Sequence, residues 1–279
     1  SRLGARETLA DVAHNLERWV NVIVLRTYAH ATVTGMAEYA RVPVVNALSD
    51  IEHPCQALTD IFTLEEHFGS LRGLNITYVG DGNNVAHSLQ LAAVLMGANI
   101  TLASAEGYGP SPEFLAAAEN FAATYPTLAA KDAARMGHPG STVVPGTVRC
   151  MTDARVAVAG ADAVYTDAWA SMGQENEAEM RQNIFASYQV NRELMALAAP
   201  HAVFMHCLPA HRGEEVTDEV IDSAQSIVFD QAENRMHVQK AILLLLLDAA
   251  QPAPQTEPRR RGIRSFPAGT QKPSTLPTY

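Results

Sequence analysis

The sequence predicts an α/β protein built on doubly wound parallel sheets, and three observations support this prediction. Short apolar runs, typical of buried strands, alternate along the chain with longer segments in which apolar residues recur at helical spacing. Strands that alternate with helices form parallel sheets, because each returning helix covers a face of the sheet. Polar residues follow directly after the apolar runs, at the edge where parallel sheets bind ligands. We expect two such domains, linked by helices.

The first part of the chain is expected to alternate between helices and strands from residue 9 onwards. Apolar residues of 9–20 recur at helical spacing, and "NVIVLR" (21–26) is typical of a buried strand. Pro54 would lie in the first turn of a helix over 54–68, where its missing N–H is harmless. The other elements expected here are helices over 34–41 and 84–96 and strands over 42–47, 74–79 and 98–103.

The second part continues the alternation after a helix over 111–125, for which Ser111 is the candidate cap. Residues 126–146 are rich in glycine and proline and are expected to be irregular. The remaining expected elements are strands over 147–151, 163–169, 202–207 and 226–230 and helices over 153–160, 190–199 and 232–249. Residues 251–279, with six prolines and almost no apolar periodicity, predict a disordered tail.

Composition and charge limit the possible partners. Of the 279 residues, 47% are hydrophobic and 18% charged, an ordinary balance for a globular protein. The formal net charge is −10; since five basic residues and one acidic residue follow residue 250, residues 1–250 carry −14. A body this acidic is a poor partner for nucleic acid or an anionic membrane. An anionic substrate would need local basic residues.

The cysteines and the apolar runs limit the compartment. The three cysteines, Cys55, Cys150 and Cys207, form no CxxC pair, which argues against a disulfide framework and a zinc cluster and favours a reducing, cytoplasmic compartment. The longest apolar run, Ala241–Leu247, is far shorter than the ~20 residues that span a bilayer. No signal peptide is recognisable at the start. Because Ser1 is not a natural initiator, the sequence is compatible with a preceding segment, where a mitochondrial transit peptide would lie.

Polar side chains follow six of the expected strands, which is where the predicted fold places a crevice. They are, in chain order, Arg26 and His30, then His53 and Gln56, then Asp81, Asn83 and Asn84, then Asp167, Ser171 and Met172, then His206 and Cys207, and finally Arg235.

The basic residues of this set have both a functional and a structural interpretation. Arg26 could fork two oxygens of a phosphate, or it could be an ordinary solvent-facing cation. His53 could cap a helix, but together with Gln56 it would point two polar groups at an anion bound to the helix N-terminus. Arg235 alone indicates little, since helices often carry an exposed arginine.

The other members of the set are also open to two interpretations. Asp167 either pairs within the fold or holds a substrate ammonium group. Cys207 is most simply a small buried apolar residue. Alternation along a strand points His206 to the opposite face, so a Cys–His nucleophile is disfavoured. Met172 would serve loop packing unless its backbone N–H faces a ligand.

The turn "GDGNN" resembles a nucleotide-binding loop but departs from the dinucleotide fingerprint G-x-G-x-x-G. Gly80 and Gly82 are present, and Val85 stands where the third glycine would be. The carboxylate of Asp81 would repel a pyrophosphate. Asparagine side chains both donate and accept hydrogen bonds, so the turn better suits a small zwitterion or a carboxylate.

With these residues assembled, the chain resembles the ornithine carbamoyltransferases from about Ser1 to Asp248. One matching stretch would indicate little, but six occur in the family's order. They are "RTYAH", "HPCQALTDIFTLEEHFG", "VGDGNNVAHS", "DAWASMGQE", "HCLPAHRGEEV" and "AENRMHVQKAIL". The "SMG" and "HCLP" stretches together separate this family from its aspartate- and putrescine-using relatives.

The resemblance implies transfer of a carbamoyl group from carbamoyl phosphate to L-ornithine, giving L-citrulline and phosphate, with no metal or organic cofactor. Matched residue by residue, it implies that carbamoyl phosphate is held by Arg26, His53, Gln56, Cys207, Leu208 and Arg235 and ornithine by Asn84, Asp167, Ser171 and Met172. Among these, Arg26, His53, Cys207 and Arg235 would act on the reacting group.

The resemblance also implies a domain division: a partial carbamoyl-phosphate-binding domain (1–52 and 232–250), an ornithine-binding domain (53–231) and the tail (251–279). It implies a homotrimer or higher oligomer whose site borrows residues from a neighbour. The family's Ser-Thr-Arg-Thr-Arg phosphate-binding motif precedes all six stretches and is absent from these 279 residues. We therefore expect the first domain to be incomplete and this chain alone to be inactive.

Three other functions stay open on the sequence. A truncated relative could bind ornithine without turning it over. A carbamoyltransferase could act on an acylated ornithine, because that selectivity depends on loop shape. A nicotinamide oxidoreductase could use the same kind of sheet.

Overall fold

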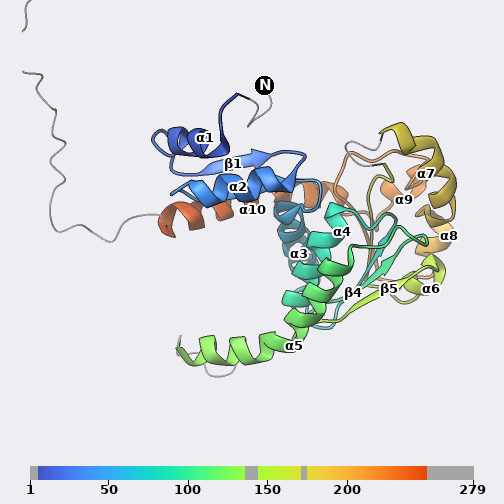
Figure 1. Ribbon diagram of the computed structural model, residues 1–279. Helices are drawn as coiled ribbons and strands as arrows, with labels where there is room; N and C mark the ends of the chain where they lie inside the picture. The colour runs from blue at the N-terminus through green and yellow to red at the C-terminus, as the bar shows by residue number, and fades with distance from the viewer. Residues whose placement is uncertain (1–5, 136–143, 171–174, 250–279) are drawn as a thin grey trace, which may run out of the picture.

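The computed structural model describes residues 6–135, 144–170 and 175–249, which form two parallel sheets (Figure 1). The smaller sheet pairs β1 (Ile23–Arg26) with β2 (Val44–Leu48). The larger sheet has five strands, in the order β5 (Val148–Met151), β4 (Asn99–Ala103), β3 (Asn75–Val79), β6 (Ala163–Thr166) and β7 (Val203–His206). All pairings between these strands are parallel, which confirms the predicted fold class.

The strand order of the larger sheet places its reversal of direction between β3 and β6. From β3 the chain moves outward through β4 to β5, and it then returns to β6 and β7 on the other side. In doubly wound sheets, such a reversal opens a crevice beyond the carboxyl ends of the two central strands. The stretches "GDGNN" and "DAW", which follow β3 and β6, therefore face a shared crevice.

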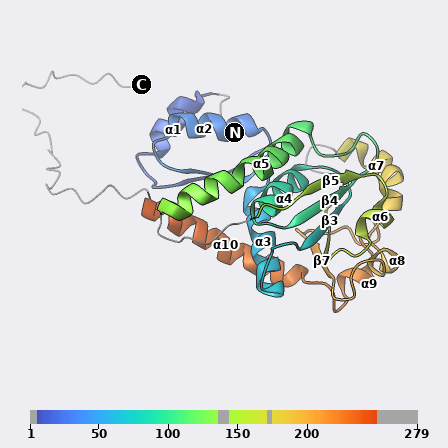
Figure 2. The same cartoon turned by 90° about the horizontal axis from the view of Figure 1, so that it is seen from below.

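Two long helices connect the sheets. α3 (Pro54–Phe68) packs against α10 (Val228–Ala249), which starts beside β7 and runs past the smaller sheet (Figures 1 and 2). The other helices are α1 (Leu9–Leu16), α2 (His30–Tyr39), α4 (Asn84–Leu95), α5 (Pro112–Arg135), α6 (Ala154–Val158), α7 (Ala178–Phe185), α8 (Arg192–Met195) and α9 (Asp218–Ile221). Short 3-10 turns cover Glu175–Glu177 and Ala186–Tyr188.

Apolar layers cover both faces of the larger sheet, because successive strand residues point to opposite faces. One layer joins the strands to α3 and α4, and it includes Leu64, Ile76, Tyr78, Leu89, Tyr165 and Met205. The opposite layer includes Val79, Val164, Trp169, Phe185 and Phe204. The smaller sheet has a separate core with α1 and α2, formed by Ala13, Ile23, Leu25, Val33 and Met36.

Helix α3 begins and ends at the predicted residues, and local chemistry explains both ends. Pro54 occupies the first turn, where its fixed φ suits the helix and no N–H is needed. Gly69 ends the helix in the left-handed conformation, with φ of 75°. The strand and helix around "GDGNN" lie within one residue of the predicted bounds.

The predicted strand over 226–230 is wrong. Only Ser226 forms an isolated bridge, to Phe204, and α10 already begins at Val228. The stretch "SIVF" is a short apolar run, and periodicity alone does not distinguish such a run in a strand from the start of a buried helix.

Other boundaries also differ from the predictions. α5 continues to Arg135, so residues 126–135 are helical rather than irregular; the alanines of "LAAKDAAR" favour helix more than the flanking glycines and prolines suggested. The expected helix over 190–199 is reduced to α8, and α7 lies where a polar loop was expected. α1 ends at Leu16, which leaves Trp19 exposed.

Two expectations concern parts of the chain for which the structure has different scope. The tail over 251–279 lies outside the described residues. Within the described ranges, no helix combines the length and apolar character needed to cross a membrane.

Candidate active site

A cavity of about 610 Å³ lies at the carboxyl ends of β3, β6 and β7 and extends to the smaller sheet. Seven residues predicted from strand ends or motifs line it: Arg26, His53, Asn84, Asp167, Cys207, Leu208 and Arg235. Gln56 does not line the cavity, but its side-chain oxygen accepts a hydrogen bond from Arg235. Ser171 and Met172 lie outside the described residues.

The wall nearest the smaller sheet is cationic. Arg26 ends β1 and Arg235 lies on α10, so two elements far apart in sequence each contribute a guanidinium group. Between them His53 is 6% exposed, and burial, followed by the charges of Arg235 and Arg26, lowers its pKa to about 3. A neutral imidazole and two permanent cations therefore face the cavity, a set suited to an anion with several oxygens.

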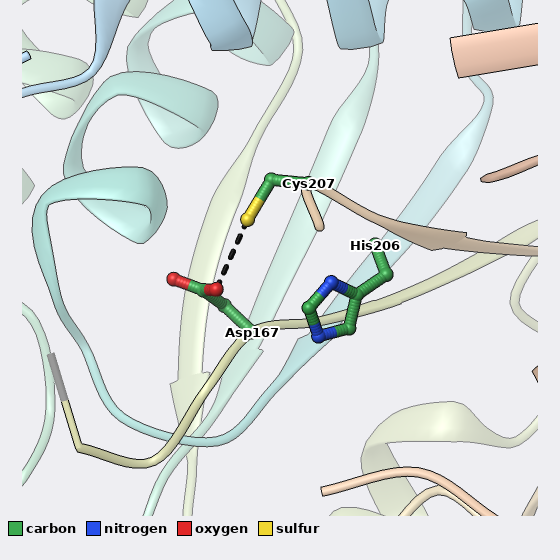
Figure 3. Close-up of side chains that lie close together, drawn as sticks. All are labelled: Asp167, His206 and Cys207. Atoms are coloured by element: carbon green, nitrogen blue, oxygen red, sulfur yellow. Dashed lines mark hydrogen bonds between the residues drawn. The ribbon is translucent and has the colours of Figure 1, made fainter. Parts of the chain in front are cut away.

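The opposite wall contains a thiol–carboxyl pair (Figure 3). The Cys207 thiol donates to Oδ1 of Asp167 at 3.0 Å, and the amide of Asn83 donates to Oδ2 at 2.7 Å. Burial, and then the Asp167 charge, raises the pKa of Cys207 well above its ordinary value. The thiol is therefore neutral and serves as a hydrogen-bond donor rather than as a nucleophile.

His206 is engaged away from this thiol. It is fully buried, its Nδ1 accepts from the Leu208 N–H at 2.9 Å, and its Nε2 lies 3.2 Å from Oε1 of Glu215. Ligand atoms of Asp167, His206 and Cys207 lie within 4.8 Å of one another. A protonated thiol and an imidazole with both nitrogens in use are poor metal ligands, however, and this arrangement supports hydrogen bonding instead.

The glycines of "GDGNN" have distinct roles in the turn. Gly80 adopts φ of 135°, a conformation open to glycine alone. At Gly82, a Cβ would lie 2.2 Å from the backbone nitrogen of Pro110 and 2.3 Å from the carbonyl carbon of Gly109. Asn83 caps α4 by accepting from two backbone N–H groups of the first turn.

Gly82→Ala is expected to destabilise the protein, because the added methyl group overlaps backbone that cannot rotate away. A cost of about 1–3 kcal/mol in the free energy of unfolding follows from overpacking of this kind. Gly109→Ala is the matched control: it lies on the other side of the same contact, and a Cβ there meets nothing within 4 Å. Urea unfolding of both variants checks the prediction, and equal losses would contradict it.

Asn84 starts α4 and lines the cavity, and its side-chain nitrogen donates to the backbone oxygen of Ser49 at 2.8 Å. An amide nitrogen carries two hydrogens. One is used by Ser49, and the second is free to donate to a ligand carboxylate. This geometry is compatible with the ligand role that the sequence predicted for Asn84.

Sequence reasoning missed Arg181, which also lines the cavity. It is 6% exposed and donates to Asp81 at 2.9 Å and to the backbone oxygen of Trp169 at 3.1 Å. Its guanidinium carbon lies 5.2 Å from the ring centre of Tyr108. The carboxylate of Asp81, expected to repel a phosphate, is thus paired with a cation one hundred residues away, and no local pattern signals that pairing.

Comparisons with known proteins match both parts of the chain. Residues 1–66 match the carbamoyl-P binding domain of the aspartate/ornithine carbamoyltransferases, and residues 72–246 match their Asp/Orn binding domain. An ornithine carbamoyltransferase of Symbiobacterium thermophilum is 51% identical over 241 residues, which is 86% of this chain and 72% of that protein. An ornithine carbamoyltransferase of Thermococcus kodakarensis is 52% identical over 241 residues, 86% of this chain and 70% of that protein.

Solved structures agree. The ornithine carbamoyltransferase from Pyrococcus furiosus superposes with a TM-score of 0.77 at 49% identity, over 89% of this chain and 73% of that one. A mutant N-acetyl-L-ornithine transcarbamylase superposes with a TM-score of 0.69 at 32% identity, over 86% and 73% of the two chains. The chain belongs to the aspartate/ornithine carbamoyltransferase family.

Proposed function

We propose that this chain provides the active site for carbamoyl transfer from carbamoyl phosphate to L-ornithine, which yields L-citrulline and phosphate. One observation carries the proposal: a single cavity has two guanidinium groups on one wall and a thiol–carboxyl pair with an asparagine on the other. The cationic wall suits a phosphate, and the other wall suits an amino acid with an ammonium and a carboxylate group.

Carbamoyl phosphate binds at the cationic wall in this proposal. Arg26 and Arg235 hold phosphate oxygens, and Gln56 fixes the direction of Arg235 by accepting from it. The neutral imidazole of His53 offers an N–H to the carbonyl oxygen, on which negative charge develops during the reaction.

Ornithine binds at the opposite wall. Asn84, at the start of α4, donates to the α-carboxylate, and Asp167 accepts from the α-ammonium. Ser171 and Met172, which follow Asp167 closely in the sequence, complete the set by their match to the family's "SMG" stretch. The side chain of ornithine then extends past Cys207 towards the cationic wall.

The reaction joins the ornithine side-chain nitrogen to the carbonyl carbon and breaks the bond from that carbon to the phosphate oxygen. The amine must first lose a proton, since a free alkyl amine has a pKa near ~10.4. Desolvation in the cavity and the nearby guanidinium groups favour its neutral form. The same guanidinium groups stabilise the departing phosphate, so the chemistry requires neither a metal nor an organic cofactor.

The proposal includes a homotrimer or higher oligomer in the cytoplasm, as the family resemblance implies. It also keeps the domain division at residues 52–53 and 231–232. Analytical ultracentrifugation of the purified protein would test the oligomeric state.

The activity is tested in an extended protein, in which a family segment carrying the Ser-Thr-Arg-Thr-Arg motif precedes Ser1. The extended protein is expected to form citrulline from ornithine and carbamoyl phosphate, whereas the 279-residue chain alone is expected to form none. Absence of citrulline from a folded extended protein would overturn the proposed function. Ornithine binding to that protein by calorimetry, without turnover, would instead favour a binding protein.

An acylated ornithine is the second candidate substrate, because the fold also superposes on a mutant N-acetyl-L-ornithine transcarbamylase. The identity is 32% in that comparison and 49% with the Pyrococcus furiosus enzyme, which favours free ornithine. Assaying the extended protein with N-acetyl-ornithine in place of ornithine decides between them.

Asn84→Ala in the extended protein is expected to raise the KM for ornithine by about tenfold or more, because a hydrogen bond to a charged group contributes about 1.5–3 kcal/mol. The KM for carbamoyl phosphate should change far less. Asn99→Ala, at the distant start of β4, is the control. Equal increases in both KM values would rule out this role of Asn84.

A further inference from the structure

Three polar side chains at the start of α4 hold the loop at residues 49–53, which connects β2 to α3. The contacts are Asn84 Nδ2 to the Ser49 oxygen at 2.8 Å, His87 Nδ1 to the Ile51 oxygen at 3.0 Å, and the His53 N–H to Ser88 Oγ at 2.8 Å. Residues three and four apart share one face of a helix. The loop that carries His53 is therefore fixed by a single face of α4.

His87 also holds a second segment. Its Nε2 lies 2.9 Å from the backbone nitrogen of Ser111, and its ring stacks on Phe114 with 4.3 Å between the ring centres. Ser111 directly follows the turn at residues 107–110, of which Gly107, Tyr108 and Gly109 line the cavity. One imidazole thus joins two opposite rims of the site, the loop at 49–53 and the turn at 107–110.

The two partners fix the state of the ring. A backbone carbonyl only accepts, so Nδ1 must carry the proton that is donated to Ile51. A backbone N–H only donates, so Nε2 must be unprotonated to accept from Ser111. The ring is therefore neutral, and burial, which lowers the pKa of His87, favours the same form. With 7% of its surface exposed, the ring has both nitrogens in use.

We propose that His87 is a positioning residue for carbamoyl transfer, which sets the distance between the carbamoyl-phosphate wall and the ornithine wall by holding one rim with each ring nitrogen. The inference rests on the proposed function and extends it, since neither rim alone would show which residue relates them. A purely structural histidine would instead stabilise the fold without distinguishing the two substrates.

Two variants separate the two hydrogen bonds. His87→Asn places an amide N–H near the position of Nδ1, so it keeps the bond to Ile51 and loses the one to Ser111. His87→Gln places an amide oxygen near the position of Nε2, so it keeps the bond to Ser111 and loses the one to Ile51. Ser88→Ala releases the same loop as His87→Gln, but by an independent contact.

In the extended protein, His87→Gln and Ser88→Ala are expected to raise the KM for carbamoyl phosphate by about tenfold, the equivalent of about 1.4 kcal/mol. His87→Asn should raise the KM for ornithine by a similar factor, with little change for carbamoyl phosphate. His14→Asn, at an exposed site on α1, should leave both values unchanged. Equal effects of the two His87 variants on both substrates would overturn the proposal.

A second measurement uses the 279-residue chain and needs no activity. Exchange of the Ser111 amide hydrogen, followed by NMR, should be slow in the unmodified chain and in His87→Gln and fast in His87→Asn. Fast exchange in the unmodified chain, or the same rate in both variants, would overturn the role of His87. Slow exchange with the expected pattern, together with an extended protein that forms no citrulline, would refute the proposed function while leaving the contact intact.

Discussion

Asp167→Asn is expected to lower kcat/KM for ornithine in the extended protein by roughly a hundredfold or more, because a desolvated charge that loses its charged partner costs about 2–5 kcal/mol. Asp167 is held in place from both sides, since Cys207 donates to one carboxylate oxygen and Asn83 to the other. The variant keeps the shape of the side chain but removes the charge that the substrate ammonium requires. The KM for carbamoyl phosphate should change little.

The matched control is Asp162→Asn, because Asp162 directly precedes β6, at the end of the strand opposite Asp167. Its carboxylate accepts from the Asn75 backbone and from His201, away from the cavity. Steady-state kinetics with both substrates varied should therefore show a loss for Asp167→Asn and near-normal values for Asp162→Asn. A normal KM for ornithine in Asp167→Asn would remove Asp167 from the binding set.

The sequence predicts the parts of the site that depend on local rules. The bounds of α3 follow from Pro54 and Gly69, and the turn after β3 follows from Gly80. The rule that ligands meet the carboxyl ends of parallel strands then brings Arg26, His53 and Asp167 to one edge before any distance is known.

The parts that the sequence does not reveal depend on contacts between distant residues. Arg181 reaches Asp81 across one hundred residues, and each alone resembles an ordinary surface charge. The wrong strand over 226–230 has a related cause: the apolar stretch that starts α10 fits a strand equally well until α3 is known to cover it. His87 lies inside a recognised motif, but its two backbone partners, Ile51 and Ser111, are fixed only by the fold.

Asp60 is the clearest case of a residue whose importance appears only in three dimensions. It lies on α3, is fully buried, and accepts hydrogen bonds at 2.7 Å from Gln56 and from Gln231, which is 171 residues away on α10. Gln56 in turn accepts from Arg235 at the cavity wall. A buried carboxyl group therefore supports the side chain that aims a phosphate-binding arginine.

The titration of Asp60 gives the second large prediction. Burial raises its pKa from 3.8 to about 7, partly offset by the hydrogen bonds from Gln56 and Gln231. Between these two pKa values the folded state keeps a proton that the unfolded state has lost, so the free energy of unfolding falls as the pH rises. A shift of about three units corresponds to roughly 4 kcal/mol, present in full below pH ~4 and lost by pH ~8.

Asp60→Asn imitates the protonated carboxyl at every pH and should therefore be free of this loss. The difference in unfolding free energy, variant minus unmodified chain, is expected to rise by about 4 kcal/mol between pH 4 and pH 8. Urea unfolding of the 279-residue chain across this range measures it directly, and the value at pH 4 serves as the internal reference for the change of side chain itself. A difference that stays constant with pH would show that Asp60 ionises normally in the folded protein, and the polar network around Gln56 would then have to hold a full buried charge.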